Sequence, residues 1–318
     1  MHRALVALDR HDERQGGGAA PAGPRSWSPE PVGGSRRSRR AARRAARRVN
    51  GPGRRRGAQL VGVALVVGAF ALQTNLDRLL PAKADRVAGQ GLPPAGVGAS
   101  SQRVLPAVVG PSGSGGYRFL ATQPHGTDPV TYDPCRTIHY VIHQGPAPAA
   151  ALPLVRQAVA AVSRASGLRF VEDGSTSEAP TEKRKAYQPD RYGERWAPVL
   201  IAWSDPQESP GLAGPVAGLG GSRPWRDTHG HLTYVTGTVR LDTPALLPAT
   251  GPVLAAGEVH TARVRAVVMH ELGHVVGLAH VSDRRQLMFA DNTGQTAFGD
   301  GDRRGLALLG RGACVPGL

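Results

Sequence analysis

The chain has 318 residues, of which 5% are aromatic, while Gly and Pro contribute 42 and 27 residues. This composition favours one core of modest size with much linker and loop over two large domains. The net charge of +15 suggests a nucleic-acid binder, but residues 1–56 hold 15 Lys/Arg against 4 Asp/Glu and so carry +11 of it; the charge therefore says little about the folded part.

Residues 1–56 are predicted to be a disordered basic tail in the cytoplasm. Residues 1–35 show no hydrophobic period, and the tract Arg36–Arg56 contains 11 arginines. Such a tract beside a membrane segment usually sets topology and contacts anionic headgroups. It lacks the interleaved aromatics that stack on bases, so nucleic acid is disfavoured as a partner. A membrane protein that binds another polyanion through this tract stays open as an alternative.

Residues 57–73 (GAQLVGVALVVGAFALQ) carry no charge over 17 residues, the short end of the roughly 17–25 needed to cross a bilayer as a helix. The arginines before them predict a transmembrane signal anchor, with the downstream chain outside the cell. The alternative is a signal peptide cleaved near Ala71, which would make the protein secreted. The expected location is the cell membrane, as a single-pass protein.

Residues 74–116 are rich in Pro, Gly, Ala and Ser and are predicted to be a linker, and 117–318 to be one folded domain. The expected elements are strands at 137–143, 168–172 and 198–203, a strand or hairpin arm at 232–242, and helices at 150–167 and 261–276, the second with Thr261 as its N-cap. This order favours an α+β fold with two long helices against a twisted mixed sheet.

The two cysteines, Cys135 and Cys314, lie near the two ends of this predicted domain, and their spacing fits no metal motif. In an oxidising compartment, a disulfide between them would tie the C-terminal end of the domain to its first strand. Two unpaired buried thiols are the alternative.

The segment VVMHELGHVVGLAHVSDRRQLM, residues 267–288, holds the candidate site. His270 and His274 are four residues apart on the predicted helix, so their rings project from one face about one turn apart. Both can then reach one ion at the roughly 2.0–2.1 Å that zinc requires. Glu271, beside the first histidine, can accept a proton from zinc-bound water.

His280 can join these ligands only if the helix ends first. In a continuous helix it would lie roughly 15 Å along the axis from His270. Gly277 can adopt the positive φ that ends a helix and lets the chain reverse. Three histidines leave a fourth zinc position open, as expected of a catalytic site. Solvated histidines on a surface helix, or a zinc site without catalysis, are the alternatives.

The motif H-E-x-x-H-x-x-G-x-x-H resembles that of the metzincin zinc peptidases, which are named for it and for a methionine turn beneath the metal. Met288 follows His280 by eight residues, an interval that looks most like the matrixin branch, as does Gly277-Leu278. The resemblance is specific over 261–310, where 298–310 looks like the final matrixin helix with Asp300 or Asp302 as its cap. It is looser over 117–260.

The resemblance implies a metzincin-like catalytic domain with a small C-terminal subdomain after the third ligand. It implies zinc bound by His270, His274 and His280, with Glu271 as general base and acid in the hydrolysis of a protein or peptide, and a structural role for Met288. Residues 237–242 are expected to form the edge strand above the cleft. A zinc-binding ectodomain without catalysis is the alternative function. The sequence leaves open whether a structural calcium site is present, and it does not determine the oligomeric state or the cleavage preference.

Two departures from the matrixin pattern are visible in the sequence. Phe289 and Ala290 stand where matrixins usually have Tyr and Pro, which affects the expected wall of the pocket after Met288. Residues 1–116 contain no cysteine, so the usual propeptide cysteine switch is absent. Any latency would therefore have another basis.

Overall fold

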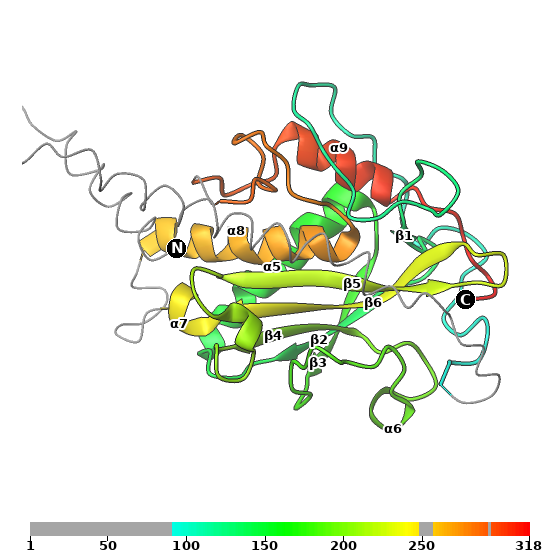
Figure 1. Ribbon diagram of the computed structural model, residues 1–318, viewed down its shortest axis with the longest axis horizontal. Helices are drawn as coiled ribbons and strands as arrows, with labels where there is room; N and C mark the ends of the chain where they lie inside the picture. Colours follow the sequence, from blue (N-terminus) through cyan, green and yellow to red (C-terminus); the bar gives the residue numbers. More distant parts are fainter. Residues whose placement is uncertain (1–90, 248–256, 292–293) are drawn as a thin grey trace, which may run out of the picture. The chain divides into compact units, whose positions relative to one another are not determined.

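The computed structural model describes residues 91–247, 257–291 and 294–318 (Figure 1). The predicted tail (1–56), signal anchor (57–73) and first part of the linker lie outside these ranges and stay predictions. Within the described ranges, no helix combines the length and the apolar character needed to cross a membrane.

A mixed six-stranded sheet forms the centre of the domain. Its strands are β1 (Thr131–Tyr132), β2 (Ile138–His143), β3 (Phe170–Ser175), β4 (Val199–Ser204), β5 (Gly218–Arg226) and β6 (Leu232–Asp242). The order is β1-β6-β4-β2-β3, all parallel, and β5 pairs antiparallel with β6. The predicted mixed sheet is confirmed.

Two long helices, α5 (Leu152–Ser166) and α8 (Gly257–Val276), supply apolar side chains to one large core on the same side of the sheet (Figure 1). The shorter helical elements are α6 (Pro189–Tyr192), α7 (Thr243–Leu246), α9 (Asp300–Leu309), η1 (Ala149–Ala151) and η2 (Pro210–Leu212). Gly167 ends α5 with φ of 71°, as its position after the apolar period predicted.

The predicted start of the second helix, at Thr261, was wrong. Helix α8 includes residues from Gly257 onward, so Thr261 lies inside it and is not its N-cap. The Thr261 hydroxyl instead donates to the carbonyl of Glu258 at 2.9 Å. A threonine within a helix can satisfy its hydroxyl in this way, which the sequence pattern alone does not distinguish from a cap.

Both faces of the central strands are covered, because side chains alternate between them. From β4, Val199 and Ile201 enter the large core with the helices. Leu200 and Ala202 enter a small second cluster with Val141, against which Tyr192 of α6 packs. Burial on both faces explains why β4 reads as a continuous apolar run.

The expected edge strand at 237–242 was wrong. These residues belong to β6, which is paired with β4 and β1 along one side and with β5 along the other. Among the described strands, β5 has only β6 as a partner and forms this edge. The sequence analysis did not predict β5 because glycine is depleted in strands and this strand contains three, Gly218, Gly220 and Gly221.

Residues before position 117 also belong to the folded domain. Ser100 N–H donates to Cys135 O at 2.8 Å, and Val104 N–H to Pro134 O at 3.0 Å. Arg304 of α9 donates to the carbonyls of Gly113 and Gly115. The described part of the predicted linker therefore packs along the domain.

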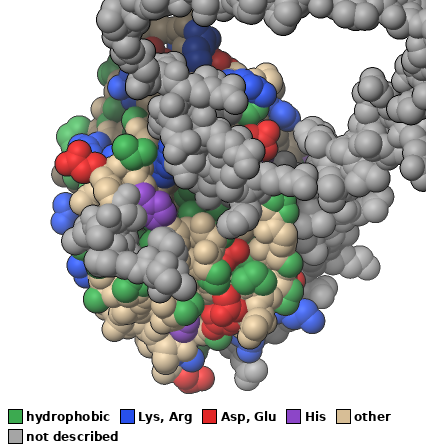
Figure 2. All heavy atoms as spheres, turned by 90° about the vertical axis from the view of Figure 1, so that its left-hand side faces the viewer, with side chains coloured by type: hydrophobic (Ala, Val, Ile, Leu, Met, Phe, Trp, Pro, Cys, Tyr) green, Lys and Arg blue, Asp and Glu red, His purple; other side chains and the backbone are tan. Residues whose placement is uncertain are grey.

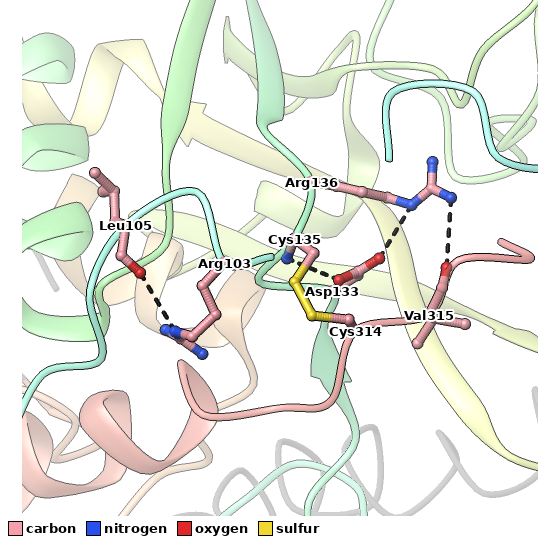
Figure 3. Close-up of a disulfide and its surroundings, with 7 residues drawn as sticks. All are labelled: Arg103, Leu105, Asp133, Cys135, Arg136, Cys314 and Val315. Carbon is pink, nitrogen blue, oxygen red and sulfur yellow. Dashed lines mark hydrogen bonds and ion pairs between the residues drawn. A yellow bond between two sulfur atoms is a disulfide. The ribbon is translucent and has the colours of Figure 1, made fainter. Parts of the chain in front are cut away.

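The predicted disulfide between Cys135 and Cys314 is confirmed, with the two Cα atoms 5.3 Å apart (Figure 3). Beside it, buried Asp133 accepts hydrogen bonds from Cys135 N–H at 2.8 Å and from Arg136 Nε at 3.1 Å. Arg136 also donates to Val315 O at 3.4 Å, so the disulfide and this hydrogen bond both join the segment around Cys135 to the C-terminal segment.

Candidate metal centre

The three predicted ligands come together at the C-terminal end of α8. His270 and His274 lie on the helix, and His280 follows it. Their Nε2 atoms are separated by 3.0 Å (His270–His280), 3.1 Å (His270–His274) and 3.1 Å (His274–His280). These three histidines form a group whose geometry permits metal binding.

The turn at Gly277 produces this convergence. Helix α8 ends at Val276, and Gly277 has a φ of 125°. The N–H groups of Gly277 and Leu278 both donate to Gly273 O, at 3.0 and 2.9 Å. A side chain other than glycine is strained at this φ. The stretch is thus a helix followed by a reversal, as its three histidines predicted.

Backbone carbonyls orient two of the imidazole rings. His270 Nδ1 lies 2.7 Å from Leu287 O, and His274 Nδ1 lies 2.7 Å from Leu278 O. A carbonyl only accepts, so each Nδ1 carries the proton and each Nε2 keeps its lone pair. The lone pairs therefore face a common point.

Burial keeps these rings neutral, the form that binds metals. It lowers the pKa of His270 to about 4, and that of His274 well below its usual value. Burial also lowers the pKa of His280. Lone pairs 3 Å apart repel one another unless they share a cation, and three imidazole nitrogens suit zinc at 2.0–2.1 Å. The donor set therefore fits zinc.

Glu271 is buried, with 6% of its surface exposed, between α8 and the edge strand β5. Burial raises its pKa to about 8, and a hydrogen bond from Gly220 N–H opposes this rise only in part. A side chain at Gly218 or Gly220 would overlap Glu271 atoms. The absence of side chains at these two glycines thus lets β5 approach Glu271 closely. A bound cation would lower this pKa.

Met288 lies directly beneath the histidine helix and is fully buried. An ideal Cβ placed on Gly273 would lie 2.6 Å from Met288 Sδ, so glycine is needed for this contact. Val281 N–H donates to Met288 O at 3.0 Å, which closes the loop between His280 and Met288. The methionine therefore supports the turn of α8 that carries His274.

Asp302 of α9 holds the same loop from the other side. Its buried carboxylate accepts from Leu287 N–H at 2.6 Å and from Gly299 N–H at 3.0 Å. Gly299 is the N-cap residue of α9, and Asp302, at the third helical position, completes the cap from inside. Asp302 thus fixes Leu287, whose carbonyl orients His270. The sequence suggested Asp302 as a cap but not this contact.

The other described histidines do not add to the centre. His139 pairs with Asp173 at 2.7 Å, and His143 lies 3.7 Å from Glu208. His125, His229 and His231 line a separate pocket of about 680 Å³. Within the described ranges, the second group with possible ligand atoms is Asp133 with the two disulfide-bonded cysteines, whose sulfurs are already bonded to each other.

One comparison with known proteins, a family model, covers this centre. Residues 209–306, which span β5, β6, α8 and the three histidines, match the family model described as matrixin. No curated protein matches the chain. Together with the assembled motif, the matrixin match identifies a metzincin-like domain and supports a zinc metallopeptidase in general.

A solved structure, archaemetzincin from Methanopyrus kandleri, is similar at 18% identity over 54% of this chain and 92% of that chain, with a TM-score of 0.34. At this score the similarity carries no conclusion about the site. The identification therefore depends on the matrixin match and on the geometry of the motif.

Proposed function

We propose that this protein is a zinc-dependent metalloendopeptidase with His270, His274 and His280 as the zinc ligands. The observation that carries the proposal is the convergence of three Nε2 atoms within 3.0–3.1 Å on a segment that matches matrixins. The segment after His280, with Met288 and α9, serves as the small C-terminal subdomain that supports the ligands.

Glu271 is the proposed general base and general acid. When bound, zinc supplies Lewis acidity that polarises the scissile carbonyl and acidifies water. The Glu271 carboxylate takes the proton from the attacking water and then gives it to the leaving amine. Its burial raises its pKa, which suits a carboxyl group that must hold this proton between the two steps. Gly220 N–H orients the carboxylate.

The proposed substrate is an extended segment of a protein or peptide. Among the described strands, β5 is paired on one side only, and it lies against Glu271. An extended chain can add to such an edge through backbone hydrogen bonds, which places a peptide bond near the site without requiring particular side chains.

The test is Glu271→Gln, which keeps the size of the side chain but removes its basicity. We expect the kcat for cleavage of an unstructured protein to fall about 10²–10⁴-fold, while the bound zinc measured by elemental analysis stays the same. Equal activity of the two proteins would exclude Glu271 as the base. A wild-type protein that binds zinc and cleaves nothing would support the non-catalytic ectodomain instead.

We further propose that residues 57–73 anchor the protein and that the domain faces outward. The disulfide supports this location, since such bonds persist in oxidising compartments. Protease added to intact cells should remove the domain from a membrane-bound full-length chain. If the domain appears in the medium, cleavage near Ala71 is the better explanation. A domain that is protected inside intact cells would contradict both.

The alternative polyanion-binding role was predicted for the Arg36–Arg56 tract, which lies outside the described residues. On the face drawn in Figure 2, Lys/Arg and Asp/Glu side chains of the described residues are interspersed. Deletion of residues 1–56 decides whether the arginine tract binds polyanions. Unchanged binding to anionic vesicles and to nucleic acid would exclude that role for it.

A further inference from the structure

Ser222 of β5 makes a contact that the proposed chemistry does not use. Its hydroxyl donates to Val275 O at 2.7 Å. Val275 belongs to the last turn of α8 and follows the proposed ligand His274. The last carbonyls of a helix have no partner within the helix, so one of these groups is satisfied here from the sheet.

Tyr132 of β1 completes this contact. Its hydroxyl lies 2.7 Å from Ser222 Oγ. A serine hydroxyl has one proton, and Ser222 uses it on Val275 O, so Tyr132 must be the donor in this second bond. Tyr132 is 4% exposed. The resulting relay runs from Tyr132 through Ser222 to Val275 and joins β1, β5 and α8.

Gly237 of β6 leaves the space that the relay occupies. An ideal Cβ at this position would lie 2.7 Å from Ser222 Oγ and 3.2 Å from Tyr132 OH. Glycine within a strand often marks a close approach of other groups, and here those groups are two hydroxyls. A side chain at position 237 would overlap these hydroxyl groups, which explains why glycine lies between two threonines in β6.

Strand β5 and helix α8 lie in register through these contacts. Gly220 contacts Glu271 and Ser222 contacts Val275. Two residues along a strand advance roughly 6.6–6.8 Å, and four residues along a helix advance about 6 Å. The advance along the strand nearly equals the advance along the helix. The hydrogen bond from Ser222 to Val275 O therefore also determines the position of Gly220 relative to Glu271.

We propose that Ser222 is a positioning residue, which locks the edge strand to the last turn of α8 and so holds Glu271 and His274 in one geometry. This inference rests on the proposed peptidase function. It predicts that the hydroxyl of Ser222 affects both the retention of zinc and the rate of catalysis, although it contacts neither metal nor substrate.

The test compares Ser222→Ala, Ser222→Thr and Tyr132→Phe with a matched control, Ser166→Ala. Ser166 of α5 is also buried and also donates to a backbone carbonyl, that of Val162, at 2.8 Å. The readouts are the rate of zinc release to a chromogenic chelator, kcat and KM for an unstructured protein, amide exchange at Gly277 and Leu278 in metal-free protein, and the melting temperature.

We expect Ser222→Ala to release zinc about tenfold faster and to lower kcat about tenfold, because one orphaned carbonyl loosens the helix end. Amide exchange at Gly277 and Leu278 should accelerate. Ser222→Thr keeps the hydroxyl and should restore most of each property, and Tyr132→Phe should be intermediate. Ser166→Ala should lower only the melting temperature.

The proposal would be overturned if Ser222→Ala behaved like the control Ser166→Ala, so that each variant lowered the melting temperature and changed no other readout. If the wild type binds zinc but cleaves no peptide, the peptidase proposal fails by itself. Zinc release and amide exchange then still decide the role of Ser222, because neither requires catalysis.

Discussion

At the scale of single residues, the turn after α8 depends most on Gly277. Its φ of 125° is strained for any other residue, and an added Cβ would lie 3.0 Å from Leu309 Cδ2 and 3.3 Å from Tyr234 Cε2. The next residue, Leu278, provides the carbonyl that orients His274. A substitution here therefore strains the backbone and displaces a contact of the metal centre.

We predict that Gly277→Ala lowers the free energy of unfolding by about 1–3 kcal/mol through backbone strain and also weakens zinc binding. The measurements are urea denaturation and competition with a chelator. Gly174→Ala is the control, since Gly174 has a φ of 96° but no neighbouring atom within 4 Å. If both variants retain zinc as the wild type does, the turn is not what holds His280 in place.

At the scale of elements, a buried ion pair fixes the loop between β3 and β4 on the sheet. Glu178 and Arg184 have side chains only 8% and 5% exposed and form two hydrogen bonds of 2.9 Å. Arg184 also donates to Thr236 Oγ1 at 2.9 Å and to Pro198 O at 2.8 Å. The loop is therefore attached to β6 and to the residue before β4.

The pKa of Glu178 is lowered. Burial alone would raise it, but hydrogen bonds from Arg184, Gln188 and Tyr192 together outweigh burial. A carboxyl group with a depressed folded-state pKa contributes stability that is present above its unfolded value, about 4.3, and is lost as the pH falls through the folded value.

We predict that Glu178→Gln lowers the free energy of unfolding at pH 7 by about 3–5 kcal/mol, since it leaves Arg184 buried without its partner charge. The difference from the wild type should shrink as the pH falls below about 4, which urea denaturation from pH 7 to pH 3 measures. Glu194→Gln, at an exposed position of the same loop, should show no such difference. A difference independent of pH would contradict the assignment to the ionised pair.

At the scale of the whole domain, the disulfide joins positions 179 residues apart. Closing so long a loop lowers the entropy of the unfolded chain, which the chain-entropy model converts to a stabilisation of roughly 5 kcal/mol. Removal of a native disulfide typically lowers the free energy of unfolding by about 2–5 kcal/mol. The disulfide lies beside the Asp133–Arg136 pair and outside the segment that carries the three histidines, and we expect it to contribute to the stability of the domain.

We predict that the double variant Cys135→Ser, Cys314→Ser unfolds at lower urea concentration, with a loss of about 2–5 kcal/mol. Reducing agent should lower the midpoint of the wild type to the same level and leave the double variant unchanged. A wild-type midpoint that does not respond to complete reduction would show that packing of the two segments suffices without the covalent bond.

The sequence by itself determined the parts of this protein that obey local rules. The i, i+4 spacing of His270 and His274 and the glycine that ends their helix follow from helix geometry, and the structure has both. Most strand positions followed from side-chain alternation or an apolar run, and the full β6 range was read correctly. The pairing of Cys135 with Cys314 followed from there being only two cysteines.

The tertiary structure alone decided which of these elements are neighbours. It made β6 an interior strand and the glycine-rich β5 the edge, and it brought Ser222 to Val275 and Asp302 to Leu287. Residues that support the histidines lie up to 53 positions from their partners in the chain. Local periodicity reports the conformation of a segment but not its packing partners, since those are selected by the burial of surfaces from distant segments.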